Sequence, residues 1–271
     1  MTYSLKHSSF DFEDIKVGYF TAGEGLPVMM IHGSGPGASS LGNWSKVLKP
    51  LSQRYRVYAM DLVGFGTSDR KPTQPYFDFS LWVRQAKAML DLIDVPQIGV
   101  IGHSLSAAIA LQLASADQRI RAVLTTGAIG APFAVSDATK RVWRSPANRD
   151  ELVATLSTLI HDRSIIDEAY IANREPVVFS PGYGDYFNEM FTGHPEQYVE
   201  QTTLSDDTLS AITCPVVMLH GREDIPFPAK TSEILASKIN HADLTLLHHC
   251  SHSVAFERSD AFLAAAYHLF N

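Results

Sequence analysis

Residues 98–116 read IGVIGHSLSAAIALQLASA: a short apolar run, a sharp turn and then a helical pattern. The apolar run is typical of a buried strand, and the residues after Ser104 repeat apolar side chains at helical spacing. A serine between a strand and a helix projects its hydroxyl clear of the sheet, and its strained backbone requires small neighbours. Gly102 and Ser106 are both small. The stretch therefore predicts a strand-to-helix turn that carries Ser104 as a nucleophile.

One alternative to this interpretation of Gly102-His103-Ser104-Leu105-Ser106 stays open. The nucleophile motif usually closes with glycine, and Ser106 stands in that place. Serine is also a favoured N-cap residue, so an ordinary helix beginning at Ser104 would have a similar sequence. The choice depends on whether the rest of the chain supplies a general base and an acid.

Strand and helix patterns alternate along much of the chain, which predicts a mostly parallel sheet covered by helices on both faces. Buried strands are predicted at residues 28–31, 55–60, 98–102, 120–126, 216–220 and 244–247. Helices are predicted at residues 82–93, 105–116 and 231–239. We expect residues 16–22 to pair antiparallel at the edge of the sheet.

The alternation stops between residues 131 and 206, which show helical patterns without an obvious strand. We interpret this segment as a helical cap over the strand ends, where α/β sheets keep their active sites. A long surface loop is the alternative, but such loops are uncommon in compact domains. The predicted organisation is a first core part at 1–130, a cap at 131–206 and a second core part at 207–271.

Composition excludes several classes of function. The chain has 271 residues, 45% of them hydrophobic, and a net charge of −7, whereas nucleic-acid binding needs a basic face. No apolar run is long enough to span a bilayer, and residues 1–10 lack the apolar stretch of a secretory signal. Cys214 and Cys250 lie beside predicted strands without a CxxC spacing, so we expect reduced core residues. We therefore expect a cytoplasmic protein with neither nucleic-acid nor membrane partners.

A nucleophilic serine needs a base to take its proton and a third group to orient that base. Asp224 follows the predicted strand at 216–220, and His252 follows the one at 244–247. In hydrolases with a strand-to-helix nucleophile the triad comes in the order serine, acid, histidine. Order and context thus predict Ser104 as nucleophile, Asp224 as orienting acid and His252 as general base.

Other titratable residues near these positions receive structural interpretations. We expect Glu223 to be a surface partner of Arg222. Of His248 and His249, we expect one to be packed and the other solvated. Asp61 begins a glycine-rich loop and is expected to brace that turn.

The sequence IHGSGPG at residues 31–37 follows another predicted strand. Its glycines let backbone N–H groups approach a developing oxyanion, and we assign the oxyanion hole to the N–H groups of Ser34 and Leu105. A phosphate-binding loop is the competing interpretation. The stretch lacks the lysine and the glycine spacing that such a loop requires.

The stretch HGSGPGASS at residues 32–40, followed by Asn43 and Trp44, resembles the signature of the meta-cleavage product hydrolases. Members of this family are α/β-hydrolases that cut carbon–carbon bonds in dienol ring-fission products of aromatic degradation. DLVGFGTSD at residues 61–69 and the pair His252 and Glu257 support the resemblance. It implies a mostly parallel eight-stranded sheet with helices on both faces, an inserted helical cap, a small-molecule substrate and a homodimer or larger homo-oligomer.

The resemblance also implies substrate-binding residues. Asn173-Arg174-Glu175 matches the place where the family has an arginine near the substrate, so Arg174 could bind a carboxylate or carbonyl; a solvated surface arginine is the alternative. Two residues depart from the family: His103 replaces an asparagine before the nucleophile, and Ser253 replaces a tryptophan after the catalytic histidine. The candidate substrate-binding residues are Gly33, Gly35, His103, Arg174 and Ser253.

Three functions remain to be weighed. The first is cofactor-free and metal-free hydrolysis of a vinylogous 1,5-diketone formed from a dienol, through an acyl-Ser104 intermediate. The second is an esterase, lactonase or amidase with the same triad, which the departures at His103 and Ser253 favour. The third is a ligand-binding receptor without turnover, against which the intact triad counts. Haloalkane dehalogenases and epoxide hydrolases fit poorly, because their nucleophile is an aspartate.

Overall fold

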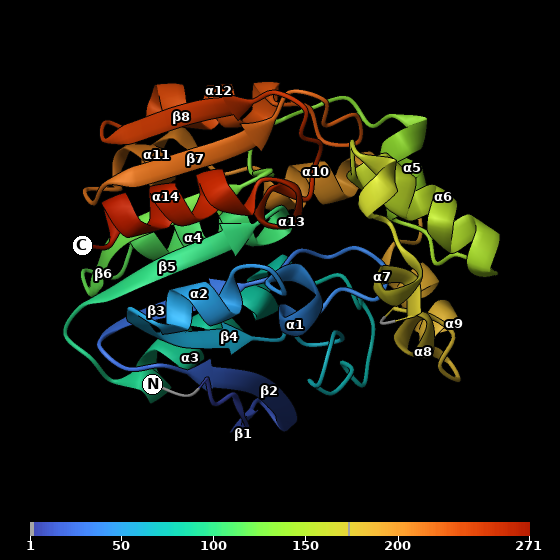
Figure 1. The fold of residues 1–271 in the computed structure, drawn as a ribbon, viewed down its shortest axis with the longest axis horizontal. Coiled ribbons are helices and arrows are strands. Elements are labelled where there is room, and N and C mark those ends of the chain that lie inside the picture. Colours follow the sequence, from blue (N-terminus) through green and yellow to red (C-terminus); the bar gives the residue numbers. More distant parts are fainter. Residues whose placement is uncertain (1–2, 173) are drawn as a thin grey trace.

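The computed structural model describes residues 3–172 and 174–271, and its centre is a single eight-stranded sheet (Figure 1). The strand order is β1-β2-β4-β3-β5-β6-β7-β8. The pairs β1–β2 and β2–β4 are antiparallel and all the others are parallel. The strands are β1 Lys6–Phe12, β2 Ile15–Ala22, β3 Leu26–Ile31, β4 Tyr55–Met60, β5 Ile98–His103, β6 Ile120–Thr126, β7 Val216–Gly221 and β8 Ala242–Leu247.

The edge of the sheet differs from the prediction. Residues 16–22 do form an antiparallel strand, but β1 lies outside it, so the prediction of an edge position was wrong. Glu13 and Asp14 join the two strands as a two-residue turn in which both have positive φ, 46° and 61°. Such turns usually contain glycine or asparagine, and β1 is mostly exposed and polar. Neither usual signal for a hairpin was therefore present.

Helices cover both faces of the sheet, as predicted (Figure 1). Side chains from α3 and α4 belong to one buried apolar cluster, and side chains from α2 and α14 belong to the cluster on the opposite face. Both cysteines are free; Cys250 is buried, but Cys214 is only half-buried. The helices flanking the sheet are α1 Ser40–Asn43, α2 Leu48–Ser52, α3 Phe79–Ile93, α4 Leu105–Ala114, α11 Asp206–Ser210, α12 Lys230–Lys238, α13 Val254–Glu257 and α14 Ser259–Leu269.

The segment between β6 and α11 consists of short helices gathered at one end of the sheet (Figure 1). Aromatic side chains join them to the core: Trp143 stacks on Phe191 with ring centroids 5.6 Å apart and lies 6.0 Å from Phe227. The elements are α5 Asp137–Val142, α6 Arg149–Leu159, the 3-10 helix η1 Arg163–Ile165, α7 Glu168–Ala172, α8 Glu175–Val178, α9 Tyr183–Met190 and α10 Glu196–Thr202.

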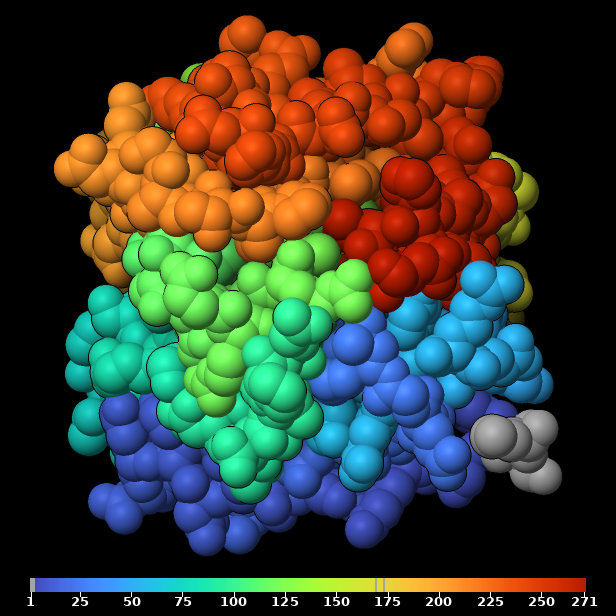
Figure 2. All heavy atoms as spheres, turned by 90° about the vertical axis from the view of Figure 1, so that its left-hand side faces the viewer, coloured from blue at the N-terminus to red at the C-terminus, as the bar shows by residue number. Residues whose placement is uncertain are grey.

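At the opposite end of the molecule the described residues form no such layer of short helices. Figure 2 shows N-terminal, middle and C-terminal segments there, one above another in roughly the order of the strands. Among the described residues, none of the helices combines the length and the apolar character needed to cross a membrane.

Candidate functional site

The turn at Ser104 is strained. Ser104 lies between β5 and α4 with φ 57° and ψ −121°, a backbone conformation that is rare for residues other than glycine. An ordinary N-cap residue has extended backbone and a side chain that accepts a helix N–H, whereas the Ser104 side chain makes no capping hydrogen bond. The N-cap alternative therefore does not fit, and the hydroxyl is left for another partner.

Small residues make room for this turn. A Cβ atom at Gly102 would lie 2.2 Å from the Ser106 carbonyl oxygen, so only glycine fits at that position. Ser106 is accommodated where the motif usually has glycine because its hydroxyl donates a 2.6 Å hydrogen bond to the His32 carbonyl. That bond ties the first turn of α4 to the loop that contains Ser34.

Asp224 is buried and holds three hydrogen bonds. Its Oδ2 accepts from His252 Nδ1 at 2.7 Å and from His220 Nε2 at 3.1 Å, and its Oδ1 accepts from the Phe227 N–H at 3.0 Å. Burial alone would raise the pKa of Asp224, but the charge of His252 and the hydrogen bonds from both histidines outweigh it and lower the pKa to about 2. Asp224 is thus a carboxylate at neutral pH.

His252 contacts Asp224 and lines the same cavity as Ser104. Since Asp224 occupies Nδ1, Nε2 is the nitrogen left for a different partner. The ring packs against Phe227 and His103, with centroids 4.6 and 4.7 Å away. Gly127 lies behind the ring: a Cβ there would approach His252 Nδ1 to 2.8 Å.

A small cavity brings most of the predicted residues together. Ser104 and His252 both line it. Asp224 is not in the lining, because it contacts His252 from outside the cavity. Leu105 is not in the lining either. It follows Ser104 as the first residue of α4, where a backbone N–H has no partner within the helix. The other lining residues are Gly33, Ser34, Gly35, Ala38, Asn43, His103, Val142, Leu159, Arg174, Phe227 and Ser253.

Arg174 reaches the cavity from the cap. Its guanidinium donates to the Pro36 carbonyl at 3.3 Å and to the Tyr170 hydroxyl at 3.2 Å, and it is half-buried. It forms no ion pair with a carboxylate in the part of the chain that the structure describes. Arg174 thus lines the cavity and is not a fully exposed surface arginine. Asn173, beside it in the predicted motif, lies outside the described residues.

The loop at residues 31–37 has a second attachment to the cap. The Gly37 N–H donates a 2.6 Å hydrogen bond to the hydroxyl of Tyr183, a buried residue of α9. Burial raises the pKa of Tyr183 to about 12, so the hydroxyl keeps its proton at neutral pH. The cap thus contacts the loop on which the oxyanion hole is predicted.

His103 is buried and neutral. Its Nδ1 lies 3.1 Å from the Thr126 carbonyl and 2.9 Å from the Thr126 hydroxyl. Burial and the neighbouring His252 hold the pKa of His103 well below its usual value. Because the carbonyl can only accept, Nδ1 carries the proton, and Nε2 keeps a lone pair on the side near Gly33.

Three of the structural interpretations can be compared with the contacts. Asp61 braces its loop as predicted, since its Oδ2 accepts from the Thr67 N–H at 2.8 Å. Glu223 was wrongly assigned to Arg222: it accepts the Cys250 N–H at 3.0 Å. The expectation that one of His248 and His249 is packed was also wrong, because both are exposed beyond the end of β8.

His220 was missed as a residue of the site. It is fully buried, its Nε2 donates to Asp224 Oδ2 at 3.1 Å and to the Phe227 carbonyl at 2.9 Å, and its Nδ1 lies 2.7 Å from the Ser232 hydroxyl. It therefore bonds the same carboxylate oxygen that accepts from His252. The sequence signal was its position at the end of a strand, four residues before Asp224.

A family model described as the alpha/beta hydrolase fold matches residues 27–259. The chain belongs to the α/β-hydrolase family. The eight-stranded fold predicted from the family resemblance is thereby confirmed.

This α/β-hydrolase is 30% identical to 2-hydroxymuconate semialdehyde hydrolase of Pseudomonas sp. (strain CF600), over 92% of this chain and 88% of the relative. It is 29% identical to 2-hydroxy-6-oxo-2,4-heptadienoate hydrolase of Pseudomonas putida, over 92% and 90%. The solved structure of the meta-cleavage product hydrolase CumD of Pseudomonas fluorescens IP01 superimposes with a TM-score of 0.91 at 28% identity, covering 97% of each chain. The resemblance to meta-cleavage product hydrolases is confirmed.

Proposed function

We propose that this α/β-hydrolase cleaves a carbon–carbon bond in a dienol ring-fission product, with Ser104 as nucleophile, His252 as general base and Asp224 as the acid that orients it. The observation that carries the triad is the strained turn at Ser104, which shares a cavity with a histidine held 2.7 Å from a buried carboxylate. The names of the relatives supply the substrate class.

The reaction follows from these positions. After the dienol has become its keto tautomer, Ser104 Oγ attacks the carbonyl while His252 Nε2 takes its proton. The N–H groups of Ser34 and Leu105 hold the oxyanion. The carbon–carbon bond breaks as His252 returns the proton to the leaving carbon, which leaves an acyl-Ser104. Water, deprotonated by His252, then releases the acid, and His252 reprotonates Ser104. The ketonisation moves the proton of the dienol hydroxyl to a carbon of the substrate before the attack. From the attack of Ser104 onward every proton passes through His252, and no step calls for a metal or cofactor.

Substrate recognition falls to residues around the nucleophile. Arg174, with no carboxylate partner among the described residues, supplies a cation for a substrate carboxylate. His103 offers the lone pair of Nε2 to a substrate hydroxyl. Gly33, Gly35 and Ser253 also line the cavity, where the substrate would contact them.

The cap between residues 131 and 206 carries Arg174 and Tyr183 to this cavity. We propose that it is a separate module between the core parts 1–130 and 207–271. Its C-terminal boundary is supported by α11, which begins at Asp206 and packs on α4 and α12 of the core.

A second candidate function is hydrolysis of a small carboxylic ester, lactone or amide by the same triad. The observation that favours it is the pair of departures on the cavity wall, His103 and Ser253. Hydrolysis of an ester requires no residue that binds a dienol, so these two replacements would not lower the activity of an esterase.

A spectrophotometric panel separates the two functions. Purified protein is assayed against dienol ring-fission products and p-nitrophenyl esters, with Ser104→Ala and His252→Ala as controls. We expect loss of dienolate absorbance at a kcat/KM well above that for the esters, and no turnover by either variant. Ester cleavage with inert dienols would favour the second candidate. Near-normal kcat in either variant would contradict the triad.

A further inference from the structure

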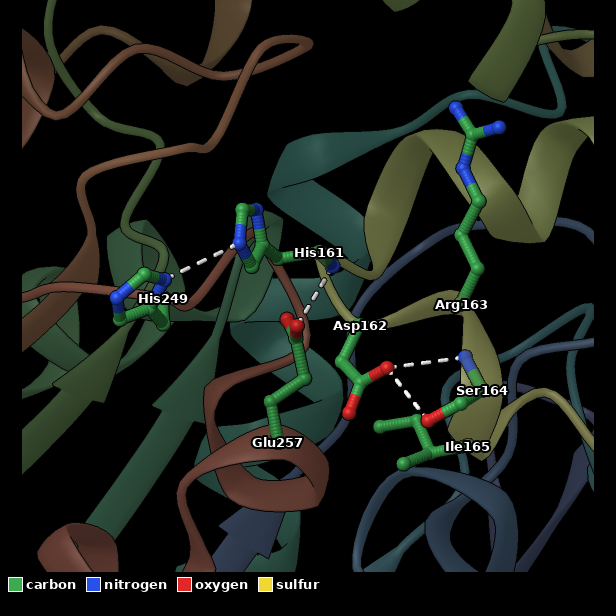
Figure 3. A pocket seen from close by; sticks show the side chains of 7 residues that line it. All are labelled: His161, Asp162, Arg163, Ser164, Ile165, His249 and Glu257. Atoms are coloured by element: carbon green, nitrogen blue, oxygen red, sulfur yellow. Dashed lines mark hydrogen bonds between the residues drawn. The ribbon is translucent and has the colours of Figure 1, made fainter.

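A second hollow lies on the surface where the cap meets the loop of His252, and Figure 3 shows its side chains. His161 and Asp162 come from the cap, His249 from the loop after β8, and Glu257 from the end of α13. The half-buried side chain of Glu257 points between the two segments (Figure 3). None of these residues lines the cavity at Ser104.

Each carboxylate oxygen of Glu257 accepts a hydrogen bond from a different segment. Oε1 accepts the Ser251 N–H at 2.9 Å, one residue before the catalytic histidine. Oε2 accepts the His161 N–H at 2.6 Å, two residues after the end of α6 (Figure 3). One side chain thus joins the His252 loop to the cap.

The cap contacts the same loop a second time. The Leu159 carbonyl, at the C-terminal end of α6, accepts both the His252 N–H and the Ser253 N–H at 3.1 Å. The last carbonyls of a helix lack partners within the helix and are free to accept such bonds. Glu257, Ser251, His252, Leu159 and His161 therefore form a closed ring of hydrogen bonds and short chain segments.

We infer that Glu257 is a positioning residue, which holds His252 against Asp224 by keeping the end of α6 and the histidine loop in register. The inference rests on the proposed triad. A carboxylate is required because both ring partners of Glu257 are N–H donors. A glutamine has one acceptor oxygen and an NH2 group, which would oppose one of the two donors.

The experiment breaks the two bonds separately. Glu257→Gln removes one acceptor from the ring. His161→Pro removes the cap-side N–H together with the imidazole. Ile160 before it has φ −129° and ψ 126°, which suits a residue preceding proline. His161→Ala is the matched reference, because it removes the same imidazole but keeps the N–H. Glu151→Gln is the control for the loss of charge: among the described residues the Glu151 carboxylate accepts only the Ala147 N–H, near the other end of α6, and an amide oxygen can still accept that bond.

The readout is covalent labelling of Ser104 by a fluorophosphonate, followed as both rate and final labelled fraction. We expect Glu257→Gln to label about ten- to a hundredfold more slowly than wild type, and His161→Pro to label more slowly than His161→Ala by the same factor. Small misplacements of a catalytic group have effects of that size. In each case the final labelled fraction should be complete. Glu151→Gln should label at the wild-type rate. The kcat of Glu257→Gln on the best substrate should fall with its labelling rate, while KM stays near the wild-type value.

Two outcomes would overturn the inference. Wild-type labelling rates in Glu257→Gln and His161→Pro would show that the ring does not position His252. An incomplete endpoint with a normal rate for the labelled molecules would show that Glu257 serves stability alone. Failure of the proposed triad gives a different result, namely labelling that survives Ser104→Ala in the protein with Glu257 intact.

Discussion

Replacement of Asp224 by asparagine should abolish most of the activity while leaving the fold intact. The carboxylate accepts from His252 Nδ1, from His220 Nε2 and from the Phe227 N–H. An asparagine cannot accept all three. If its oxygen faces Phe227, its NH2 group meets His252 Nδ1, which must then give up its proton and carry it on Nε2 instead. In that tautomer His252 has no lone pair for Ser104.

The magnitude follows from this change of tautomer. The corresponding aspartate-to-asparagine change in a serine protease lowers kcat by about four orders of magnitude, which is about 5 kcal/mol of transition-state stabilisation. In the other amide orientation the NH2 group opposes the Phe227 N–H, an unfavourable pairing of two donors within a buried site. We therefore expect a fall of about 10⁴ in kcat, together with some loss of stability.

The assay is kcat on the best substrate of the panel, with the rate of fluorophosphonate labelling as a measure that does not depend on the substrate. Asp117→Asn is the matched control, because Asp117 is a buried carboxylate that pairs with Arg119 at 2.6 Å and does not line the cavity. It should lower the melting temperature without changing kcat. If Asp224→Asn kept a kcat within tenfold of wild type, the assignment of Asp224 as the orienting acid would be refuted.

Three further predictions follow from other contacts. Gly127→Ala should lower kcat and stability together, because its φ of 52° disfavours alanine and the new Cβ would crowd His252 Nδ1; a labelling rate equal to wild type would contradict this. Arg174→Gln should raise KM for dienol acids and leave KM for neutral p-nitrophenyl esters unchanged, and an equal rise for both would remove Arg174 from carboxylate binding. The pKa of Asp224 falls from 3.8 in the unfolded chain to about 2 in the folded protein, which contributes about 2 kcal/mol of stability. That stability is present above pH 3.8 and is lost as the pH falls towards 2. In denaturant titrations between pH 5 and 2, the free energy of unfolding should therefore fall less steeply with pH in Asp224→Asn than in wild type.

The parts of the fold that could be predicted from sequence are those with strong local signals. The strands that precede Ser104 and Asp224, β5 and β7, are apolar and fully or largely buried, so their residue types alone predict strands there. β1 is polar and mostly exposed, and its pairing depends on a turn of Glu13 and Asp14 that sequence rules do not favour. The structure is therefore needed to show that β1 is a strand paired with β2.

Within the site, the order of residues along the chain predicted that Asp224 and His252 would meet, but not which other residues hold them in place. Glu223 was assigned to its neighbour Arg222, whereas its partner is the Cys250 N–H in the loop after β8. His220 and the ring at Glu257 depend likewise on contacts between segments far apart in the sequence. A single sequence states residue types and spacing, and it does not state which backbone N–H groups will face a given carboxylate.

The contacts of the cap with the Gly37 loop and with the His252 loop have a consequence for protein engineering. Exchanging the whole cap with that of a relative is an obvious way to alter which substrates are accepted. Here such a chimera would also replace Tyr183, whose hydroxyl accepts from the Gly37 N–H, and the end of α6 that positions the Leu159 carbonyl for the His252 N–H. A graft that retains residues 159–161 and Tyr183 would keep both hydrogen bonds. Such a chimera could accept new substrates without slowing the chemical step.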